Sequence, residues 1–285
     1  MNIGIIGLGL IGGSFALAAR KHIPGCVLFG EDINEEHQKL ALSLNLIDQE
    51  LTSSNYAEMD IIILAVPVDA ALERAGILLD QMNDNALLMD AGSTKASICA
   101  VLELHPKRNQ FLASHPIAGT EFSGPEAALE GLYKDKTMII CEVEATAFKL
   151  QEKAVEFFRA IGMRIRYMNA KSHDKHIAYV SHLSHISSFM LGKTVIEKEK
   201  NENDIFDMAG SGFESTVRLA KSSPAMWTPI FAENKSNVIE ALEEYISNLT
   251  AFKKLMEDDA YEAVFNEMEQ TNKIKEILNG IPHNN

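Results

Sequence analysis

Short apolar runs alternate with longer segments of mixed polarity through the first 168 residues of the chain. The runs, which include "NIGIIG", "DIIILAVP" and "ALLMDAGS", are continuous in hydrophobicity and are not interrupted by regularly spaced polar residues. Strands that are covered by helices on both faces have this pattern because neither side of them meets water. The intervening segments, such as 67–82 and 145–161, are long enough for crossover helices. The pattern therefore predicts an α/β domain with a parallel, doubly wound sheet over residues 1–168.

The pattern changes after Met168. From Ala170 onward no run is convincing as a strand, and helical periodicity covers roughly 171–199, 204–221, 224–256 and 258–279. The helix predicted over 171–199 carries apolar residues on most of its faces, so we expect several neighbours to bury it. The sequence therefore predicts an all-helical second domain over residues 169–285, which completes its core across a homodimer.

Composition and charge exclude several classes of protein. The formal net charge is −14 and no block of lysines and arginines occurs, which argues against nucleic acid and anionic membrane surfaces as partners. No stretch of eighteen uninterrupted apolar residues is present, so we expect no membrane span. Cys26, Cys99 and Cys141 are widely spaced without a CxxC pair, which is typical of a reduced, cytoplasmic protein.

The strongest local signal is a glycine-rich stretch near the N-terminus. A predicted strand ends at Ile6, a predicted helix follows, and the loop between them has the spacing GxGxxG. The first glycine permits a tight turn, the second lets the backbone approach a pyrophosphate, and the third lets helix and strand pack closely. The candidate cofactor-binding residues of this loop are Gly7, Leu8, Gly9, Leu10, Ile11 and Gly12. In this position the motif is typical of a Rossmann-type dinucleotide-binding domain.

An aspartate at the end of the next predicted strand supports that interpretation. Asp32, twenty residues past Gly12, is placed to accept hydrogen bonds from an adenosine ribose, and it would repel a 2′-phosphate. Residues 33–36 include no lysine or arginine, so the sequence favours NAD over NADP. Val66 and Pro67 follow another strand, where we expect them beside the cofactor, although a strand that simply stops at a proline has the same pattern.

Polar side chains follow several of the predicted strands. Ser93 lies in "DAGSTK", and His115 and Glu121 lie in "ASHPIAGTE". Ligands of open α/β sheets bind outside the carboxyl ends of the strands. An imidazole there, near a serine, is a candidate proton acceptor because its unperturbed pKa is about 6.5. A histidine that only caps the strand or belongs to the loop fits the spacing equally well.

The second half offers four histidines and an arginine as further candidates. The histidines form two pairs at i,i+3 spacing, His173 with His176 and His182 with His185. No carboxylate or thiolate partner has an evident place beside them, so we expect no metal, and we expect His182 or His185 to face a crevice between the halves. Arg218 could bind a carboxylate through its guanidinium or pair with Glu214 four residues earlier.

Together these segments resemble the prephenate dehydrogenase family. The resemblance covers nearly the whole chain and rests on blocks in the same order, of which HPxAGTE and SHLxH are the most specific. The blocks are GLGLIGGS at 7–14, DAGSTK at 90–95, SHPIAGTE at 114–121, SHLSH at 181–185 and RLAKSSP at 218–224 with Trp227.

The resemblance implies an oxidoreductase of tyrosine biosynthesis, which converts prephenate to 4-hydroxyphenylpyruvate by oxidative decarboxylation with NAD as hydride acceptor. It implies that His115 accepts the proton of the ring hydroxyl. Ser93 would then hydrogen-bond His115 or that hydroxyl and hold the nicotinamide edge. It also implies that Arg218 binds a substrate carboxylate and that His185 positions the substrate.

The family pattern also places Glu121 and Trp227 at the pocket, where they would line or gate it. This chain departs from the pattern at Ser184, where members often have proline, and at Glu214 and Ser215, where basic and acidic residues are common. The sequence therefore does not predict an ionic gate at the last two positions.

Three other functions fit parts of the pattern. An arogenate dehydrogenase performs the same chemistry on the amino acid in place of the keto acid, and Glu121 favours prephenate. A 3-hydroxyacid-type dehydrogenase would use a lysine such as Lys171 or Lys175 and would not require His115. A catalytically silent NAD-binding scaffold would not require a histidine, a serine and an arginine together.

Overall fold

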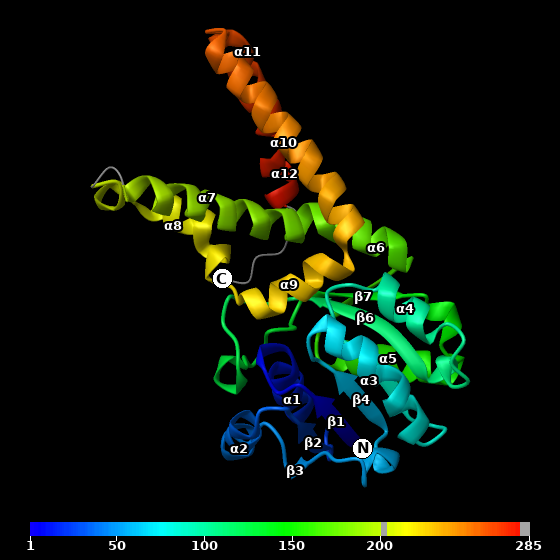
Figure 1. Cartoon of the computed structure of the whole chain (residues 1–285). Helices are drawn as coiled ribbons and strands as arrows, with labels where there is room; N and C mark the ends of the chain where they lie inside the picture. The colour runs from blue at the N-terminus through cyan, green and yellow to red at the C-terminus, as the bar shows by residue number, and fades with distance from the viewer. Residues whose placement is uncertain (201–203, 280–285) are drawn as a thin grey trace. The chain divides into compact units, whose positions relative to one another are not determined.

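The computed structural model describes residues 1–200 and 204–279 (Figure 1). The chain divides into two compact units, residues 1–235 and 236–285. The first unit contains one sheet with its covering helices and also the first helices that follow the sheet. The boundary predicted at 168/169 falls inside this unit, at the end of its last strand.

Eight strands form the sheet of the first unit, in the order β3-β2-β1-β4-β5-β6-β7-β8. Their bounds are β1 (Asn2–Ile6), β2 (Val27–Glu31), β3 (Gln49–Glu50), β4 (Ile61–Leu64), β5 (Leu87–Asp90), β6 (Phe111–Ile117), β7 (Thr137–Cys141) and β8 (Arg164–Met168). The order reverses between β1 and β4, and open sheets bind ligands at the carboxyl ends of the strands beside such a reversal. The predicted doubly wound α/β fold is confirmed.

One strand does not follow the parallel arrangement that the sequence predicts. β7 runs antiparallel to β6, in a register from Ala113 opposite Cys141 to Ile117 opposite Thr137. The segment between them contains a short 3-10 turn, η3 (Pro125–Ala127), and no crossover helix, which a parallel neighbour would need. The apolar run "TMIIC" indicates a buried strand but not its direction, so the prediction of an all-parallel sheet was wrong here.

Helices cover both faces of the sheet. They are α1 (Leu10–His22), α2 (Glu35–Ser43), α3 (Val68–Gln81), α4 (Ala96–Leu102) and α5 (Phe148–Ala160). In β4, Ile61 and Ile63 belong to the core shared with α1 and α5, whereas Ile62 and Leu64 belong to the core shared with α3 and α4. Successive strand residues point to opposite faces, so a strand buried on both sides has to be continuously apolar.

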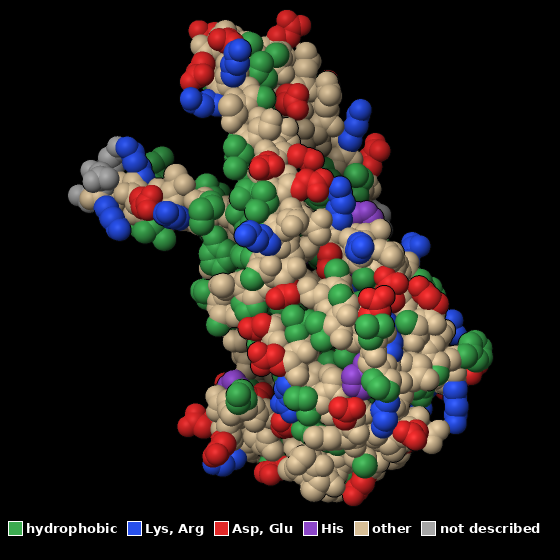
Figure 2. All heavy atoms as spheres, turned by 45° about the vertical axis from the view of Figure 1, so that its right-hand side comes forward, with side chains coloured by type: hydrophobic (Ala, Val, Ile, Leu, Met, Phe, Trp, Pro, Cys, Tyr) green, Lys and Arg blue, Asp and Glu red, His purple; other side chains and the backbone are tan. Residues whose placement is uncertain are grey.

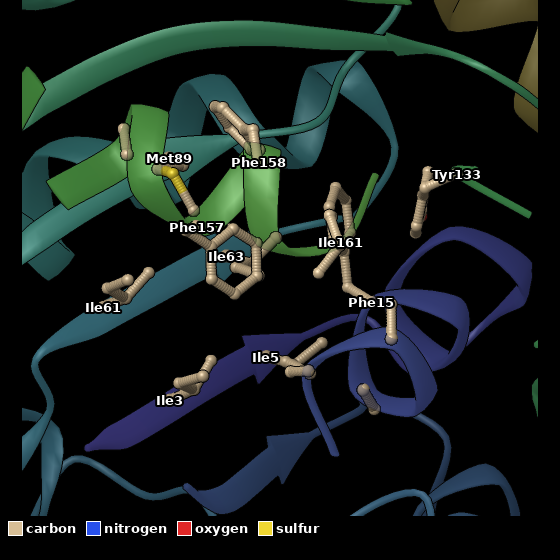
Figure 3. Packing of buried hydrophobic residues seen from close by; sticks show 14 of the residues in the cluster. Ile3, Ile5, Phe15, Ile61, Ile63, Met89, Tyr133, Phe157, Phe158 and Ile161 are labelled. Atoms are coloured by element: carbon tan, nitrogen blue, oxygen red, sulfur yellow. The ribbon is translucent and has the colours of Figure 1, made fainter. Parts of the chain in front are cut away.

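Aliphatic side chains of the strands and aromatic side chains fill the face that α1 and α5 cover (Figure 3). Phe15 of α1 stacks on Tyr133 with ring centroids 4.2 Å apart, and Phe157 of α5 lies 6.2 Å from Phe15. The Tyr133 hydroxyl donates a hydrogen bond to the carbonyl of Ile11 at 2.6 Å. Burial of each such ring contributes roughly 2 kcal/mol. The long connection after β6 is thereby held against the first turn of α1, next to the glycine-rich loop.

Beyond β8 every element in the described residues is helical, as predicted, but each of the four predicted helices is divided into shorter elements. The segment predicted over 171–199 consists of α6 (Ala170–Ile177), a π-helical turn η5 (Ala178–His182) and α7 (Leu183–Glu199). After α8 (Ser211–Val217) and the 3-10 turn η7 (Arg218–Lys221), the helix predicted over 224–256 is broken at Asn234, between α9 (Pro224–Glu233) and α10 (Lys235–Glu257). The Asn234 side chain donates to the carbonyl of Asp174 at 2.7 Å, so the residue at the break connects α9 with α6.

The second unit contains most of α10 together with α11 (Tyr261–Thr271) and α12 (Ile274–Asn279). One face of α10 is apolar and open to solvent, because Ile246, Leu249, Phe252 and Met256 follow at spacings of three and four and are each 38–53% exposed. A helix with such a face needs a further surface to cover it.

The surface carries charged side chains of both signs, which are interspersed on the face that Figure 2 shows. No helix among residues 1–200 and 204–279 is long and apolar enough to cross a membrane.

Candidate active site

The glycine-rich loop has the conformation that its spacing predicts. Gly7 has a φ of +92°, and a Cβ there would lie 2.4 Å from the carbonyl oxygen of Ala65. A Cβ on Gly12 would lie 1.9 Å from the carbonyl oxygen of Gly7, so only glycine lets α1 pack this closely on the loop. A Cβ on Gly9 would meet nothing nearer than 3.8 Å, which leaves the backbone approachable at the N-terminus of α1.

Asp32 is fixed beside this loop at the end of β2. Its Oδ2 accepts a hydrogen bond from the Leu8 amide at 2.9 Å, and its Oδ1 accepts one from the Asn34 amide at 2.9 Å. A carboxylate has about four lone-pair positions, so two remain for ribose hydroxyls. The loop and this carboxylate together fit a dinucleotide with a free 2′-hydroxyl. Val66 follows β4 and lies against Gly7, where a Cβ would be 3.1 Å from Val66 Cγ1, and Pro67 caps α3.

A buried ion pair holds the end of β5 against the middle of β6. The Lys95 ammonium is fully buried, pairs with the Asp90 carboxylate, and also donates to the carbonyl of Ser114 at 2.7 Å. The other Asp90 oxygen accepts from the Ser114 amide at 3.0 Å. The short loop that carries Ser93 runs between the two members of this pair, so the pair fixes the position of that loop relative to β6.

β6 continues past the end of β5, and the continuation carries His115. β5 pairs with β6 only from Leu88 opposite Phe111 to Met89 opposite Leu112, so the neighbouring Pro116 disrupts no hydrogen bond to β5. On the other side His115 pairs with Ile139 of β7. The imidazole is therefore held on a rigid strand, at the carboxyl edge of the sheet where ligands of this fold bind.

His115 is joined to α6 by a chain of hydrogen bonds. Its Nδ1 lies 2.8 Å from Nε2 of His173, and Nδ1 of His173 lies 2.8 Å from Oδ1 of Asp174. The three side chains are 9%, 3% and 2% exposed. Burial first, and then the neighbouring His173 and Lys95, lower the pKa of His115 well below its ordinary value of 6.5. His115 is therefore neutral at physiological pH, as a proton acceptor has to be.

A second group of rings lies around Trp227 of α9. The ring of His185 stacks on Trp227 with centroids 3.5 Å apart, and the ring of His182 meets it edge-on at 5.8 Å. His182 Nδ1 accepts from Asn234 Nδ2 at 3.2 Å, so the hydrogen of the neutral ring is on Nε2. Burial lowers the pKa of His182 to about 4. Within the described residues, neither His182 Nε2 nor Trp227 Nε1 has a hydrogen-bond partner, although both are buried.

Arg218 and Glu121, which the sequence proposes separately as site residues, form an ion pair with Arg218 Nη1 3.0 Å from Glu121 Oε2. A hydrogen bond to its own backbone, followed by the charge of Arg218, lowers the pKa of the Glu121 carboxyl. Glu214, the alternative partner of Arg218, instead lies 3.6 Å from Lys221. The loop after β6 and the turn η7 are thus brought together.

The structure supports some of the candidate site residues more than others. His115 hydrogen-bonds His173 through Nδ1 and not Ser93, so the role of Ser93 stays a prediction. The sequence named His173 as one of four candidate histidines but did not predict its contact with His115, and neither Asp174 nor Asn234 was predicted as a site residue. Lys171 and Lys175, the residues that a 3-hydroxyacid-type dehydrogenase would use, are exposed on α6. No cluster of three metal-ligating side chains occurs in residues 1–200 and 204–279.

Comparison with known proteins covers both halves of the chain. Residues 15–167 match the family model described as the nucleotide-binding domain of prephenate dehydrogenase. Residues 169–270 match the model described as its dimerization domain. The two matches meet where the sequence pattern changes from strands to helices.

Individual relatives match over nearly the whole length. The prephenate dehydrogenase of Bacillus subtilis (strain 168) is 30% identical over 286 residues, which cover 98% of this chain and 75% of the relative. The crystal structure of the A. aeolicus prephenate dehydrogenase in complex with hydroxyphenyl propionate and NAD+ is 34% identical, with a TM-score of 0.89 and 97% of each chain covered. Synechocystis arogenate dehydrogenase is 25% identical, with a TM-score of 0.78 and coverage of 98% and 100%. With the site geometry above, these matches show that the chain belongs to the prephenate dehydrogenase family.

Proposed function

We propose that this chain catalyses the NAD-dependent oxidative decarboxylation of prephenate to 4-hydroxyphenylpyruvate, with His115 as the proton acceptor. The main observation in support is that a neutral, buried imidazole lies at the carboxyl edge of the sheet, in a chain that matches the family in both halves. His115 Nε2, which has no partner within the described residues, takes the proton of the ring hydroxyl. NAD supplies the hydride acceptor when it is bound.

The electrons balance without a further acid or base. A hydride leaves the ring carbon that carries the hydroxyl as that oxygen loses its proton to His115. The bond between the ring and its carboxylate then breaks, carbon dioxide leaves, and the bonding pair enters the ring, which becomes an aromatic phenolate. The phenolate takes the proton back from His115, which gives the hydroxyl of the product and restores the neutral imidazole. The protein has only to hold the reacting carbon near the cofactor and to accept one proton, which is a task of positioning.

The residues that would hold NAD are those of the glycine-rich loop and Asp32. The α1 N-terminus and the approachable backbone at Gly9 suit the pyrophosphate, and Asp32 suits the ribose. Val66 and Pro67 follow β4 beside the loop. We infer that residues 1–168 bind NAD and that residues 169–285 bind substrate and dimerise.

Donors near Trp227 suit the carboxylates of the substrate. Arg218 offers a planar guanidinium that is still half exposed although it pairs with Glu121. The unpartnered N–H groups of His182 and Trp227 both need an acceptor, and a carboxylate or keto oxygen of the substrate is one. His185 donates from Nδ1 to the carbonyl of Ser181 at 3.0 Å, so its neutral ring offers Nε2 as an acceptor to the substrate.

Arogenate is the alternative substrate, because Synechocystis arogenate dehydrogenase is also similar in fold and sequence. The two substrates differ only in a side chain that carries a keto group or an ammonium group. Glu121 is the acidic candidate that could bind the ammonium group of arogenate. In this structure its carboxylate is paired with Arg218. A carboxylate that is already paired offers less to an ammonium, so we favour prephenate.

The apolar face of α10 supports a homodimer, since its exposed residues need a covering surface and the matched family model is described as a dimerization domain. Light scattering on the purified chain tests this.

A cytoplasmic location is supported by its free cysteines, Cys26, Cys99 and Cys141.

The assay for the proposed function mixes the purified chain with NAD and either prephenate or arogenate and follows the absorbance of the reduced nicotinamide. We expect NADH to form with prephenate and much more slowly with arogenate. Absence of NADH with both substrates contradicts the proposal, and a preference for arogenate would replace it with the alternative.

A further inference from the structure

The side chain of Asp174 acts only as an acceptor. Oδ1 accepts from the Lys95 amide at 2.8 Å, and Oδ2 accepts from the Ala96 amide at 2.8 Å. Lys95 is the N-cap residue of α4 and Ala96 is its first residue, so the carboxylate of α6 caps a helix of the sheet domain. The third contact, at 2.8 Å, is with Nδ1 of His173. A carboxylate that already accepts two backbone N–H groups can offer only lone pairs to the imidazole.

The acceptor role of the Asp174 carboxylate determines the tautomer of both histidines. His173 has to carry a hydrogen on Nδ1 to donate to Asp174, which leaves its neutral Nε2 as an acceptor. His115 then has to carry a hydrogen on Nδ1, because that atom lies 2.8 Å from the acceptor Nε2 of His173. The lone pair of the neutral His115 ring is therefore on Nε2.

We propose that His173 and Asp174 are positioning residues, which hold His115 in the tautomer whose Nε2 can accept the substrate proton. This inference rests on the proposed function for its catalytic meaning. When His115 takes the proton it becomes an imidazolium, and its Nδ1–H still donates along the same chain toward the Asp174 carboxylate. The chain thus also stabilises the charge that develops on His115, as the aspartate of a Ser-His-Asp triad does.

The surroundings favour a fixed chain. His115, His173 and Asp174 are each at least nine-tenths buried, so water does not compete for their hydrogen bonds. The rings of His115 and His173 meet edge-on, with their centroids 5.1 Å apart. The backbone carbonyl of Asp174 is itself held by Asn234 at 2.7 Å. The Asp174 end of the chain is therefore fixed by partners outside it.

The first experiment measures the tautomers directly. Two-bond proton–nitrogen correlation spectra of the full chain labelled with ¹⁵N-histidine distinguish a protonated Nδ1 from a protonated Nε2, and the His115→Asn spectrum assigns the signal. We expect His115 to be protonated on Nδ1 in the parent and to lose that preference in His173→Leu. A parent His115 that is protonated on Nε2 overturns the proposal, whatever the enzyme activity is.

The second experiment compares two variants at one position. His173→Gln places an amide oxygen near the former Nε2, so it keeps an acceptor for His115, whereas His173→Leu removes it. We expect kcat of His173→Leu to be at least about tenfold below that of His173→Gln, with KM for NAD unchanged. Asp174→Asn, which removes the charge at the end of the chain, should lower kcat by about tenfold or more.

The matched control is His176→Leu, because His176 is an exposed histidine of the same helix. Thermal melting shows which variants are folded. Equal kcat values for folded His173→Leu and His173→Gln overturn the proposal. If the parent forms no NADH from prephenate, the proposed function fails, while the spectra still decide whether the chain sets the tautomer.

Discussion

The buried chain of His115, His173 and Asp174 and the ion pair of Arg218 with Glu121 are two ways to present polar groups at one site. Side chains in the first are at most 9% exposed, whereas those of Arg218 and Glu121 are 49% and 18% exposed. Hydrogen bonds in a dry interior keep one geometry, because breaking them leaves unpaired groups. An exposed ion pair contributes little to stability and can exchange its partner.

The difference in exposure separates the residues proposed for the chemistry from those proposed for substrate binding. The proton acceptor needs a fixed tautomer, which the hydrogen bonds of the chain supply, and a pKa that keeps it neutral, which burial supplies. The residue that binds a carboxylate needs donors that a ligand can reach, and the half-exposed guanidinium of Arg218 offers them while Glu121 stays paired.

Loss of the proton acceptor should have the largest effect. His115→Asn removes Nε2, so we expect kcat/KM for prephenate to fall by about a hundredfold or more. Because His115 has a lowered pKa, kcat/KM of the parent should stay high as the pH falls below 6.5 and decline only at lower pH, where the imidazole gains its proton. Steady-state rates from pH 5 to 8 measure both effects. An acid limb centred above pH 6.5 would contradict the neutral base.

Removal of the buried ammonium should destabilise the fold. Lys95→Met leaves the Asp90 carboxylate buried without its cation, which typically costs about 3–5 kcal/mol of unfolding free energy. Urea denaturation measures the loss. Lys39→Met is the matched control, since Lys39 is 75% exposed and pairs with Glu35 at the surface. Similar stability losses in both variants would show that the buried pair is unimportant.

Acid should weaken the fold through His182. Its pKa is about 4 in the folded chain and about 6.5 when unfolded, so the unfolded chain binds the proton first and stability falls as the pH drops from 6.5 toward 4. This single group should cost about 2 kcal/mol at pH 5 relative to pH 7.5. His182→Asn should lose that part of the pH dependence, and the exposed His176→Asn should keep it. Urea denaturation of all three proteins at both pH values tests this, and equal pH dependences would refute it.

The exposed ion pair should affect binding and not stability. Arg218→Gln should raise KM for prephenate about tenfold, because a charge-assisted hydrogen bond to a carboxylate is lost, and change the unfolding free energy by less than about 0.5 kcal/mol. Lys221→Gln, which breaks the nearby exposed pair with Glu214, is the control and should leave KM unchanged. An unchanged KM in Arg218→Gln would exclude Arg218 from substrate binding.

The local sequence was sufficient to predict the cofactor site, because that site depends on local backbone geometry. The loop from Gly7 to Gly12 and the carboxylate of Asp32 lie within one strand–helix–strand unit, so spacing alone predicts how they meet. The structure reproduces this arrangement, down to the positive φ of Gly7. His115 could be predicted as a candidate because a strand end is recognisable, although its partners are not.

The partners of His115 could not be predicted because they lie 58 and 59 residues further along the chain, on another element. A signal was nevertheless present. On α6 the apolar Ala170 and Ile177 share the buried face with His173 and Asp174, whereas Lys171 lies outside it. Two adjacent polar residues at buried positions of an amphipathic helix predict a buried hydrogen-bond network.

The contact between Asp174 and the first turn of α4 has a consequence for how the protein can be divided. A fragment that ends at Met168 would contain the glycine-rich loop, Asp32 and His115, but neither member of the chain that orients the imidazole. Such a fragment could bind a dinucleotide, yet its histidine would be free to hold its proton on either nitrogen. Shuffling of the two halves between proteins is therefore restricted: a new helical half would have to bring an acceptor for His115 with it.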